Sequence, residues 1–502
     1  MTTNHHRRRG ASATFVLGLA TAMTLSGCGG SSDAISKGDD RVRVAFMQPP
    51  KAAMNPFSDD AFKLSRTSTA ESLVRIDEDV KPQAQLATKW ERMDDTTWVF
   101  TLRDDVTFHD GEKFGPDAVK NTLDRAMAFN PAPRALSGIK LSTEVTGDHE
   151  VTITTDTSDA MLPNRLASPQ LSIMSPKAYK DDGTITPVGT GTGPFELVKV
   201  NGSTTMTLDR YDDYWGEKSK TKGIDASFVP DGTARAAAIR SKEADVAETI
   251  PISQVGLLDP KAVNEVFMPR TTSVSLNTKE GPFKDPHVRA AARAAVDNKQ
   301  IADTVYEGHA DRAVGLLGPA VPWAEELRGD VESKSEPAKV DGVEITLATY
   351  TDRAENPEIA VQIEAQLEAA GFKVKQDVRE YANMEKELLG GSFDAVVVSR
   401  NTMLDTGDPL SALAQDFGCD GGNNIAQFCS EELDKVLKDG LGQPAGAERE
   451  KATMKAEELA LQADAAIPLV HERVIQGELG TMEGFARDPL ERTLVTEQTG
   501  EK

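Results

Sequence analysis

Three cysteines are the residues whose positions suggest chemistry most directly, and Cys28 is the first of them. It follows Leu25-Ser26-Gly27, at the end of an uncharged stretch (residues 11–25) that comes after Arg7-Arg8-Arg9. A basic start, a short apolar core and small residues before a cleavage point are typical of a secretory signal. Because the apolar core is shorter than the roughly 20 residues of a membrane-spanning helix, we expect export and cleavage rather than a transmembrane segment.

A cysteine directly after Leu-Ser-Gly resembles the lipobox of bacterial lipoproteins. The resemblance implies that residues 1–27 are a lipoprotein signal peptide and that the Cys28 thiol, at the new N-terminus, carries a diacylglycerol. Several acyl chains on one cysteine would hold the protein at a membrane without a transmembrane helix. Two alternatives remain open: ordinary cleavage in which Cys28 has no role, and export by a twin-arginine signal instead of the general secretory route.

The other two cysteines, Cys419 and Cys429, are ten residues apart. In an oxidising compartment, an isolated pair of thiols is typical of a disulfide. A structural zinc site would need further ligands close by, and no histidine accompanies this pair. The sequence therefore favours a disulfide over a metal site.

The remaining side chains form no recognisable catalytic or metal-binding motif. The histidines are scattered, and His109 in Phe108-His109-Asp110-Gly111 is better explained as a turn residue than as a catalytic one. The glycine-rich stretch 189–194 lacks the lysine of a phosphate-binding loop, and no G-x-S-x-G, H-E-x-x-H or C-x-x-C sequence is present. We therefore expect no enzyme, no metal site and no cofactor. An exported hydrolase remains the alternative of a different class, because catalytic triads are spatial rather than sequential.

The composition is strongly acidic, with 80 acidic against 56 basic residues and a net charge of −24. Residues 1–27 contain three arginines and no acid, so the mature chain is more acidic still. Such a surface repels nucleic acid. A chain of 502 residues is too long for one hydrophobic core, so we expect at least two globular parts after a Gly/Ser/Asp-rich flexible tether at 28–40.

Alternating strands and helices must position any binding residues. Early strands are predicted at 41–46, 98–103 and 151–154, with a turn at Asp110-Gly111 and a helix from Pro116. Later, an extended run at 274–277 precedes a helical stretch at 287–306. Strands predicted at 344–349, 372–374 and 393–398 alternate with a helix at 358–370. This order is typical of a parallel α/β unit.

Several blocks, in order, resemble the extracytoplasmic solute-binding proteins of ABC importers, family 5, the class that includes dipeptide-, oligopeptide- and nickel-binding proteins. The blocks begin with residues 86–91, 97–103, 108–111 and 117–119, and continue with Gly191-Thr192-Gly193-Pro194-Phe195, Tyr211, Tyr214-Trp215-Gly216, Leu276-Asn277, residues 282–289 and Ala295-Val296-Asp297-Asn298-Lys299. The resemblance covers nearly the whole mature chain.

The resemblance implies an α/β fold of the type II periplasmic-binding-protein class, in which two lobes joined by a two-stranded hinge close on the ligand. Carried onto this chain, lobe I covers 41–271 and regains the tail 472–502, and lobe II covers 272–471. Near residues 265–277 an extended run precedes a helical stretch, which fits the first crossing of the chain from one lobe to the other.

Within the family the chain most resembles the dipeptide-binding branch, which implies roles for individual residues. Arg353 stands where that branch has an arginine that binds the peptide carboxylate. Asp405 stands where it has an aspartate that receives the α-ammonium, and Asp408 is the alternative to Asp405. Cys419 and Cys429 stand where that branch carries a disulfide-forming pair.

A dipeptide is a zwitterion, and each charge that it buries between two lobes must be matched. Arg353 can offer a bidentate fork to a carboxylate, and Asp405 can accept hydrogen bonds from an ammonium. The tryptophan that the dipeptide branch has just before the aspartate is missing, and Met403 stands in this stretch instead. A methionine or a leucine of this stretch, Met403 or Leu404, would make the pocket wall more adaptable.

The sequence therefore predicts a monomeric substrate-binding lipoprotein of an ABC importer, anchored outside the cytoplasm by lipid on Cys28. We expect it to capture a di- or oligopeptide and to deliver it to a membrane permease. A nickel- or metal-chelate-binding protein of the same transporter class remains open, as does the exported peptide hydrolase.

Overall fold

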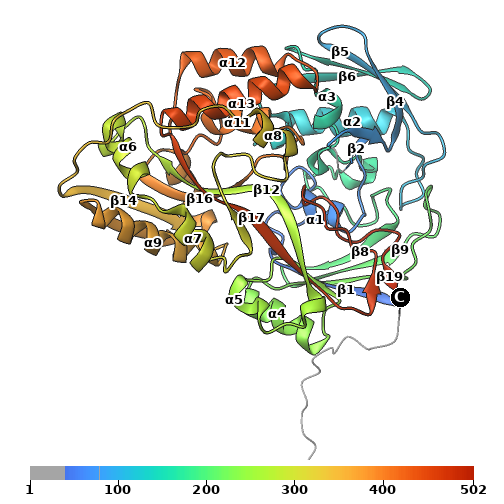
Figure 1. Cartoon of the computed structure of the whole chain (residues 1–502). Helices are drawn as coiled ribbons and strands as arrows, with labels where there is room; N and C mark the ends of the chain where they lie inside the picture. The colour runs from blue at the N-terminus through green and yellow to red at the C-terminus, as the bar shows by residue number, and fades with distance from the viewer. Residues whose placement is uncertain (1–39, 78–79) are drawn as a thin grey trace, which may run out of the picture. The chain divides into compact units, whose positions relative to one another are not determined.

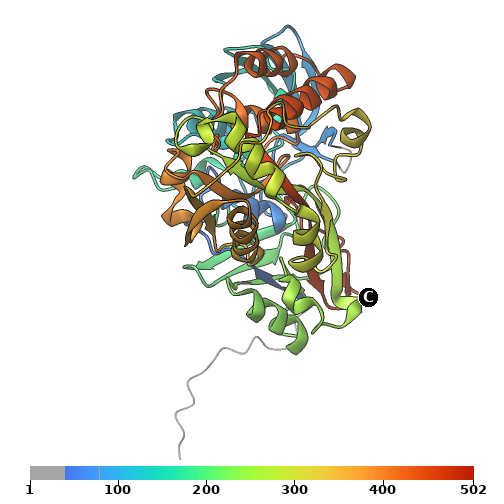
Figure 2. The same cartoon turned by 60° about the vertical axis from the view of Figure 1, so that its left-hand side comes forward.

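The structure is a computed structural model that describes residues 40–77 and 80–502. The predicted signal peptide, Cys28 and nearly all of the predicted tether lie outside these residues. From Asp40 to Lys502 the chain forms one unit in which strands and helices alternate along the sequence (Figure 1, and turned by 60° in Figure 2). No helix within the described residues is long and apolar enough to cross a membrane.

A mixed, eleven-stranded sheet runs through this unit. Its strands follow the order β15-β14-β16-β12-β17-β11-β1-β10-β9-β8, and β13 pairs with β17 outside that path. The bounds are β1 Arg41–Phe46, β8 Phe195–Asn201, β9 Thr205–Arg210, β10 Gly223–Phe228, β11 Val246–Ala247, β12 Val263–Leu276, β13 Ala310–Arg312, β14 Val343–Tyr350, β15 Phe372–Arg379, β16 Ala395–Asn401 and β17 Ala466–Glu478.

The parallel α/β unit that the sequence predicts is present at one end of this sheet. β14 pairs in parallel with both β15 and β16. Between β14 and β15 the chain forms α9 (Glu355–Ala369), which buries Ile359, Ile363 and Leu367 in the same apolar core as β14. The periodicity of these three residues is what predicts the helix, and the strand β16 lies inside the sheet as expected.

The helical stretch expected at 287–306 differs in the structure. It consists of two helices, α6 (Pro286–Ala295) and α7 (Asn298–Thr304). Asp297 between them accepts a hydrogen bond at its side chain from the backbone nitrogen of Gln300, so it is the N-cap of a new helix. A capping aspartate therefore divides an apolar pattern that otherwise reads as one helix.

The two longest strands, β12 and β17, lie side by side near the middle of the unit (Figure 1). They pair antiparallel from Val263 opposite Gly477 to Ser275 opposite Ala466, with two register shifts. The predicted lobe boundaries at 271/272 and 471/472 both fall inside these strands.

A second, four-stranded antiparallel sheet lies within the first half of the chain, in the order β4-β5-β7-β6. Its bounds are β4 Ala87–Arg92, β5 Thr97–Leu102, β6 Leu141–Gly147 and β7 Glu150–Thr155, and α2 (Pro116–Ala128) packs on it through the large apolar core that it shares with β1 and β10. Two short two-stranded sheets join β2 (Val74–Ile76) with β3 (Pro82–Ala84) and β18 (Met482–Glu483) with β19 (Gly500–Glu501).

The glycine-rich stretch and the Tyr-Trp-Gly block meet around a buried carboxylate. A Cβ at Gly191 would lie 2.2 Å from the backbone oxygen of Thr69, and one at Gly193 would lie 2.0 Å from that of Ser68. Only glycine therefore allows the glycine-rich stretch to approach the segment before β2. Glu71 accepts hydrogen bonds from Thr192 Oγ1 (2.7 Å), Tyr214 Oη (3.0 Å) and Trp215 Nε1 (2.9 Å). These blocks therefore build the interior of the first half of the chain.

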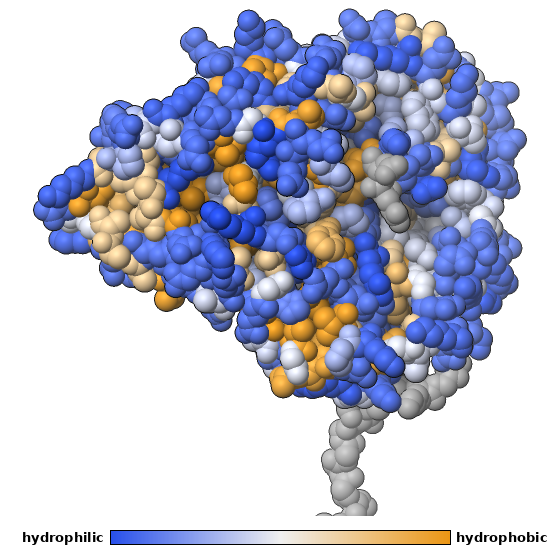
Figure 3. Space-filling view, viewed as in Figure 1, coloured by the Kyte–Doolittle hydropathy of each residue, from blue (hydrophilic) through white to orange (hydrophobic). Residues whose placement is uncertain are grey.

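The remaining helices are α1 Ala61–Arg66, α3 Leu162–Arg165, α4 Gly232–Ser241, α5 Ile252–Val255, α8 Pro322–Leu327, α10 Glu385–Leu389, α11 Pro409–Phe417, α12 Glu431–Leu441 and α13 Ala447–Gln462. The last three share a separate apolar core that includes Leu413, Leu437 and Leu459. Hydrophilic residues cover most of the face drawn in Figure 3, as the composition predicts.

Candidate functional site

Residues from several distant parts of the chain surround a cavity of about 340 Å³. Sites for small molecules commonly have volumes of ~300–1,000 Å³, so the size suits a small ligand. The walls come from the end of β1, helix α1, the strands β12 and β17, the loops after β14 and β16, and the C-terminal segment around Asp488–Leu494. Arg353 and Asp405 both line this cavity, whereas Asp408 and Met403 do not.

Arg353 lies in the loop that joins β14 to α9, beside the paired strands. Its Nη1 donates a hydrogen bond of 2.9 Å to Oε2 of Glu472 on β17. Burial alone would lower the pKa of Arg353, but the charges of Glu472 and Glu491 outweigh burial and raise it. Within the described residues, Nε and Nη2 of Arg353 donate no hydrogen bond, and the side chain is 14% exposed. These two donors are therefore available to a ligand.

Glu472 is the residue that holds Arg353 in place. Besides Arg353, it accepts hydrogen bonds from Thr272 Oγ1 on β12 (2.5 Å) and from Ser399 Oγ on β16. Burial would raise the pKa of Glu472, but the guanidinium groups of Arg353 and Arg270 lower it below its ordinary value. The carboxylate is therefore ionised and ties together three neighbouring strands and the loop that carries Arg353.

Asp405 lies in the loop between β16 and α11, and its carboxylate is already paired. Arg134 donates to Oδ1 of Asp405 through Nε at 3.1 Å, and Nη2 of Arg134 lies 3.0 Å from the same oxygen. Arg134 also pairs with Asp59, so one guanidinium serves two carboxylates. Because the Asp405 side chain is 31% exposed and a carboxylate can accept about four hydrogen bonds, further acceptor capacity remains.

Asp408 has a structural role away from the cavity. It is the N-cap of α11, where its Oδ2 accepts from the backbone nitrogen of Ser411 at 3.0 Å. It also forms a buried ion pair with Arg449 of α13, with Nε of Arg449 3.0 Å from Oδ1 of Asp408. Burial would raise the pKa of Asp408, but Arg449 lowers it. The structure therefore does not place Asp408 where it could replace Asp405 as a ligand residue.

Met403 also lies outside the cavity wall. It is 4% exposed and packs in a small apolar cluster with Leu317, Met454 and Leu490. The neighbouring residue that lines the cavity is Leu404. Of the methionine and leucine expected in this wall, the structure places Leu404 at the cavity and buries Met403.

Several charged residues of the cavity were not identified from the sequence. Arg66 of α1 pairs with Glu248 at 2.6 Å, and Arg270 of β12 pairs with Glu491 at 3.0 Å. The members of each pair are more than 180 residues apart, so no local pattern connects them. They could have been found only by knowing that β12, the helix α1 and the C-terminal segment meet.

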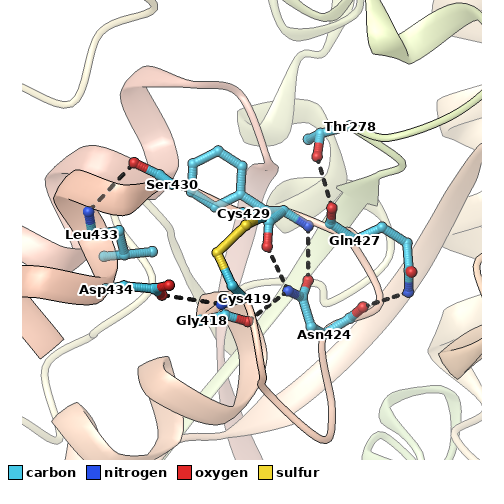
Figure 4. Close-up of a disulfide and its surroundings, with 10 residues drawn as sticks. Thr278, Gly418, Cys419, Asn424, Gln427, Cys429, Ser430, Leu433 and Asp434 are labelled. Carbon is cyan, nitrogen blue, oxygen red and sulfur yellow. Dashed lines mark hydrogen bonds between the residues drawn. A yellow bond between two sulfur atoms is a disulfide. The ribbon is translucent and has the colours of Figure 1, made fainter. Parts of the chain in front are cut away.

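Cys419 and Cys429 form a disulfide next to this part of the molecule (Figure 4). The bond closes the loop between α11 and α12. Asn424 inside the loop donates to the backbone oxygens of Gly418 (2.9 Å) and Phe428 (2.6 Å), while its own side-chain oxygen accepts from the Phe428 nitrogen. The loop that carries the cavity residues Asn423 and Ile425 is thus held at both ends. This is the pairing that the sequence predicts.

The described residues offer binding chemistry and no metal centre. No group of three or more His, Cys, Asp or Glu side chains among them could hold a metal ion. No histidine or cysteine occurs among the described residues that line the cavity. What the cavity does present is open guanidinium donors at Arg353 and a partly exposed carboxylate at Asp405.

One protein-family model matches more than half of the chain. Residues 81–424 match the family described as bacterial extracellular solute-binding proteins, family 5, middle part. The match includes Arg353 and Asp405.

Individual relatives and solved structures agree with this match. The chain is 25% identical to the nickel-binding protein NikA of Staphylococcus aureus over 430 residues (83% of this chain, 84% of the relative). It is 27% identical to the glutathione-binding protein GsiB of Salmonella paratyphi A over 439 residues (83% and 85%). The crystal structure of S. aureus NikA with Ni(L-His)2 superposes with a TM-score of 0.79 at 20% identity (92% and 100% covered). A dipeptide-binding protein of Pseudoalteromonas with bound Met-Leu gives the same TM-score, identity and coverage.

Proposed function

Because the chain belongs to the family 5 bacterial extracellular solute-binding proteins, which are non-catalytic receptors of ABC importers, we propose that it captures short peptides for import. The family membership and the periplasmic-binding-protein fold are shared with proteins that bind nickel, glutathione and peptides. Family membership does not specify the ligand, and the choice of a short peptide is what we propose.

One observation carries the proposal: Arg353 and Asp405 line the same cavity. Among the residues that the structure describes, two donor groups of Arg353 have no acceptor and can serve a carboxylate, and Asp405 retains acceptor capacity for an ammonium. A free peptide needs both, since a zwitterion buried with either end unmatched loses several kcal/mol. A cavity of about 340 Å³ suits a peptide of two or three residues rather than a long chain.

The names of similar proteins are compatible with such a ligand. Glutathione and Met-Leu are both small peptides with free carboxylate and ammonium groups, and they are the ligands named for two of the similar proteins. The apolar surface of the cavity includes Leu404, Phe46 and Tyr350. Apolar walls with a few placed charges suit a ligand whose main chain is charged and whose side chains vary.

Nickel is the second candidate, and the similarity to NikA is the observation that favours it. The described residues contain no cluster of metal ligands, so nickel would have to enter as a complex with a small organic chelator. Such a complex could present carboxylates to Arg353 as a peptide does.

The lipid anchor and the cellular setting complete the proposal. We infer that Cys28 carries the lipid and that the protein acts as a monomer with 41–271 plus 472–502 and 272–471 as its two lobes, closing on the ligand and then docking on a permease. Tethering raises the local concentration of the loaded receptor at the permease.

Calorimetric titration of the purified protein tests the proposal. The ligands are a dipeptide, its amino-acetylated and carboxyl-amidated forms, and the nickel–histidine complex. We expect the free dipeptide to bind and each blocked form to bind at least about 30-fold more weakly, because each leaves one buried charge without its partner. Binding of the nickel complex with no binding of any peptide would overturn the proposal in favour of the second candidate.

A further inference from the structure

We propose that the cavity selects peptides that carry a basic side chain, received by Asp352 and Glu385 beside the rings of Tyr350 and Tyr381. This inference rests on the proposed function, since it names the class of peptide that the same cavity takes.

The charge inventory of the cavity is the first reason. Its walls contain seven basic and seven acidic side chains: Lys51, Lys63, Arg66, Arg134, Arg270, Arg353 and Arg400, and Asp59, Glu248, Asp352, Glu385, Asp405, Asp488 and Glu491. Three of the basic groups are paired with carboxylates behind the wall, namely Lys63 with Asp60, Arg353 with Glu472 and Arg400 with Asp416. These three cations are therefore matched without using any carboxylate of the wall.

Two neighbouring carboxylates of the wall have no cation as partner among the described residues. Asp352 and Glu385 form no ion pair within the described part of the chain. One oxygen of Asp352, Oδ2, accepts a hydrogen bond of 2.7 Å from the backbone nitrogen of Tyr381, which fixes the carboxylate at the cavity. The other oxygen has no protein donor among the described residues, so it is free to accept one from a ligand.

Two aromatic rings adjoin these carboxylates. The rings of Tyr350 and Tyr381 meet edge to face with centroids 5.4 Å apart, and both line the cavity. Burial, followed by the charge of Glu385, raises the pKa of Tyr381 to about 12, so its ring stays neutral. Lysine and arginine side chains bind best where a carboxylate meets the head group and a ring covers the stem or the cation.

The basic residues near this wall do not cancel its charge. Arg353 donates to Glu472, and Arg400 is paired with Asp416 at 2.5 Å. Arg379, at the end of β15, divides its donors between Asp377 and Glu387. Each guanidinium is thus matched by a carboxylate other than Asp352 and Glu385.

Titration of the purified protein with paired dipeptides tests the inference. The ligands are alanyl-lysine, lysyl-alanine and their glutamine counterparts, at about 0.15 M salt. We expect at least one lysine peptide to bind about tenfold more tightly than its glutamine counterpart, the order that one partly desolvated ion pair with an aromatic contact supplies. If the glutamine peptides bind as tightly as both lysine peptides, the inference is wrong and the proposed function stands. If none of the four binds, the proposed function fails.

A double variant locates the preference. Asp352→Asn/Glu385→Gln should remove the preference for lysine and leave the glutamine peptides within about twofold of their original affinity, since the asparagine can still accept from Tyr381. The control Asp341→Asn/Glu368→Gln removes the same charge at two exposed sites that do not line the cavity, and it should retain the preference. Loss of the preference in the control, or its persistence in the cavity variant, contradicts the assignment.

Discussion

Thr271 on β12 and His471 on β17 face each other as register partners, and Oγ1 of Thr271 lies 2.8 Å from Nδ1 of His471. The two lobe boundaries predicted from the sequence fall on this pair. The imidazole is 5% exposed and fills the space against Gly318, where a Cβ would lie 2.4 Å from its ring. A buried, neutral histidine therefore sits where the two long strands are expected to bend.

The first prediction concerns acid stability. Burial and the charge of Arg328 lower the pKa of His471 from 6.5 to about 4. The unfolded chain then binds the extra proton more readily, so His471 favours folding fully above pH 6.5 and progressively less as the pH falls to about 4. The loss amounts to about 3 kcal/mol. His471→Gln should flatten the pH dependence of the unfolding free energy in this window, measured by urea titration at several pH values. The matched control is His149→Gln, a histidine substitution on an exposed turn.

The second prediction concerns the Arg353–Glu472 pair. Arg353→Gln leaves the Glu472 carboxylate buried without its main cation, which should lower the unfolding free energy by about 3–5 kcal/mol. Adding Glu472→Gln should recover much of that loss. Peptide affinity should remain low in both variants, because Arg353 is the proposed carboxylate receptor. Recovery of affinity in the double variant would show that Arg353 only supports the fold.

The third prediction concerns Asp405. Asp405→Ala should abolish dipeptide binding and change the melting temperature without ligand only slightly. The ion pair with Arg134 is partly exposed on both sides, and Arg134 keeps Asp59 as a partner, so the cost to stability should be within about 1 kcal/mol. Differential scanning calorimetry and ligand titration on the same samples separate the two effects.

The fourth prediction concerns Asp408, whose substitution should lower stability and leave binding unchanged. Asp408→Ala removes the cap of α11 and leaves Arg449 buried without its carboxylate, so we expect a loss of about 3–5 kcal/mol in unfolding free energy. Because Asp408 does not line the cavity, the peptide dissociation constant of the folded fraction should stay within twofold of the original. A large loss of affinity at low temperature, where the variant is folded, would mean that Asp408 contributes to ligand binding.

The fifth prediction concerns Cys28. Cys28→Ser should convert a membrane-bound protein into a released one, because a single substitution removes every acyl chain. Fractionation of cells that produce either form, followed by immunoblotting, measures this. Equal membrane association of both forms would mean that Cys28 carries no anchor. The control is Cys419→Ser/Cys429→Ser, which replaces the other two cysteines and their disulfide but should remain membrane-bound.

Local patterns account for much of the fold that the sequence predicts. The apolar spacing of Ile359, Ile363 and Leu367 predicts α9, and the alternation around it predicts the parallel pairing of β14 with its neighbours. The same reasoning merges α6 with α7, because the cap at Asp297 is a single polar residue in an apolar pattern. Asp408 is predicted as an alternative ligand residue, whereas the structure uses it as the N-cap of α11.

The site is harder to predict because it is assembled from partners far apart in the chain. Arg353 and Asp405 were identified from resemblance to a family, and they do line one cavity. Their partners Glu472 and Arg134 are 119 and 271 residues away, and nothing near either residue in the sequence indicates the pairing. The sequence alone does not tell whether Met403 or Leu404 faces the cavity, because the direction in which each side chain of a tight loop points depends on backbone angles that composition does not encode.

The guanidinium of Arg134, shared by Asp405 and Asp59, affects how easily a bound ligand is released. Asp405 is paired with Arg134, which also holds Asp59. In the proposed mode of binding, an arriving ammonium joins or replaces one cation at Asp405, and a departing one leaves no bare carboxylate behind. Loading and unloading are then exchanges between counter-ions, with a smaller barrier than exposing an unpaired charge would impose. A transport receptor needs this reversibility as much as it needs affinity.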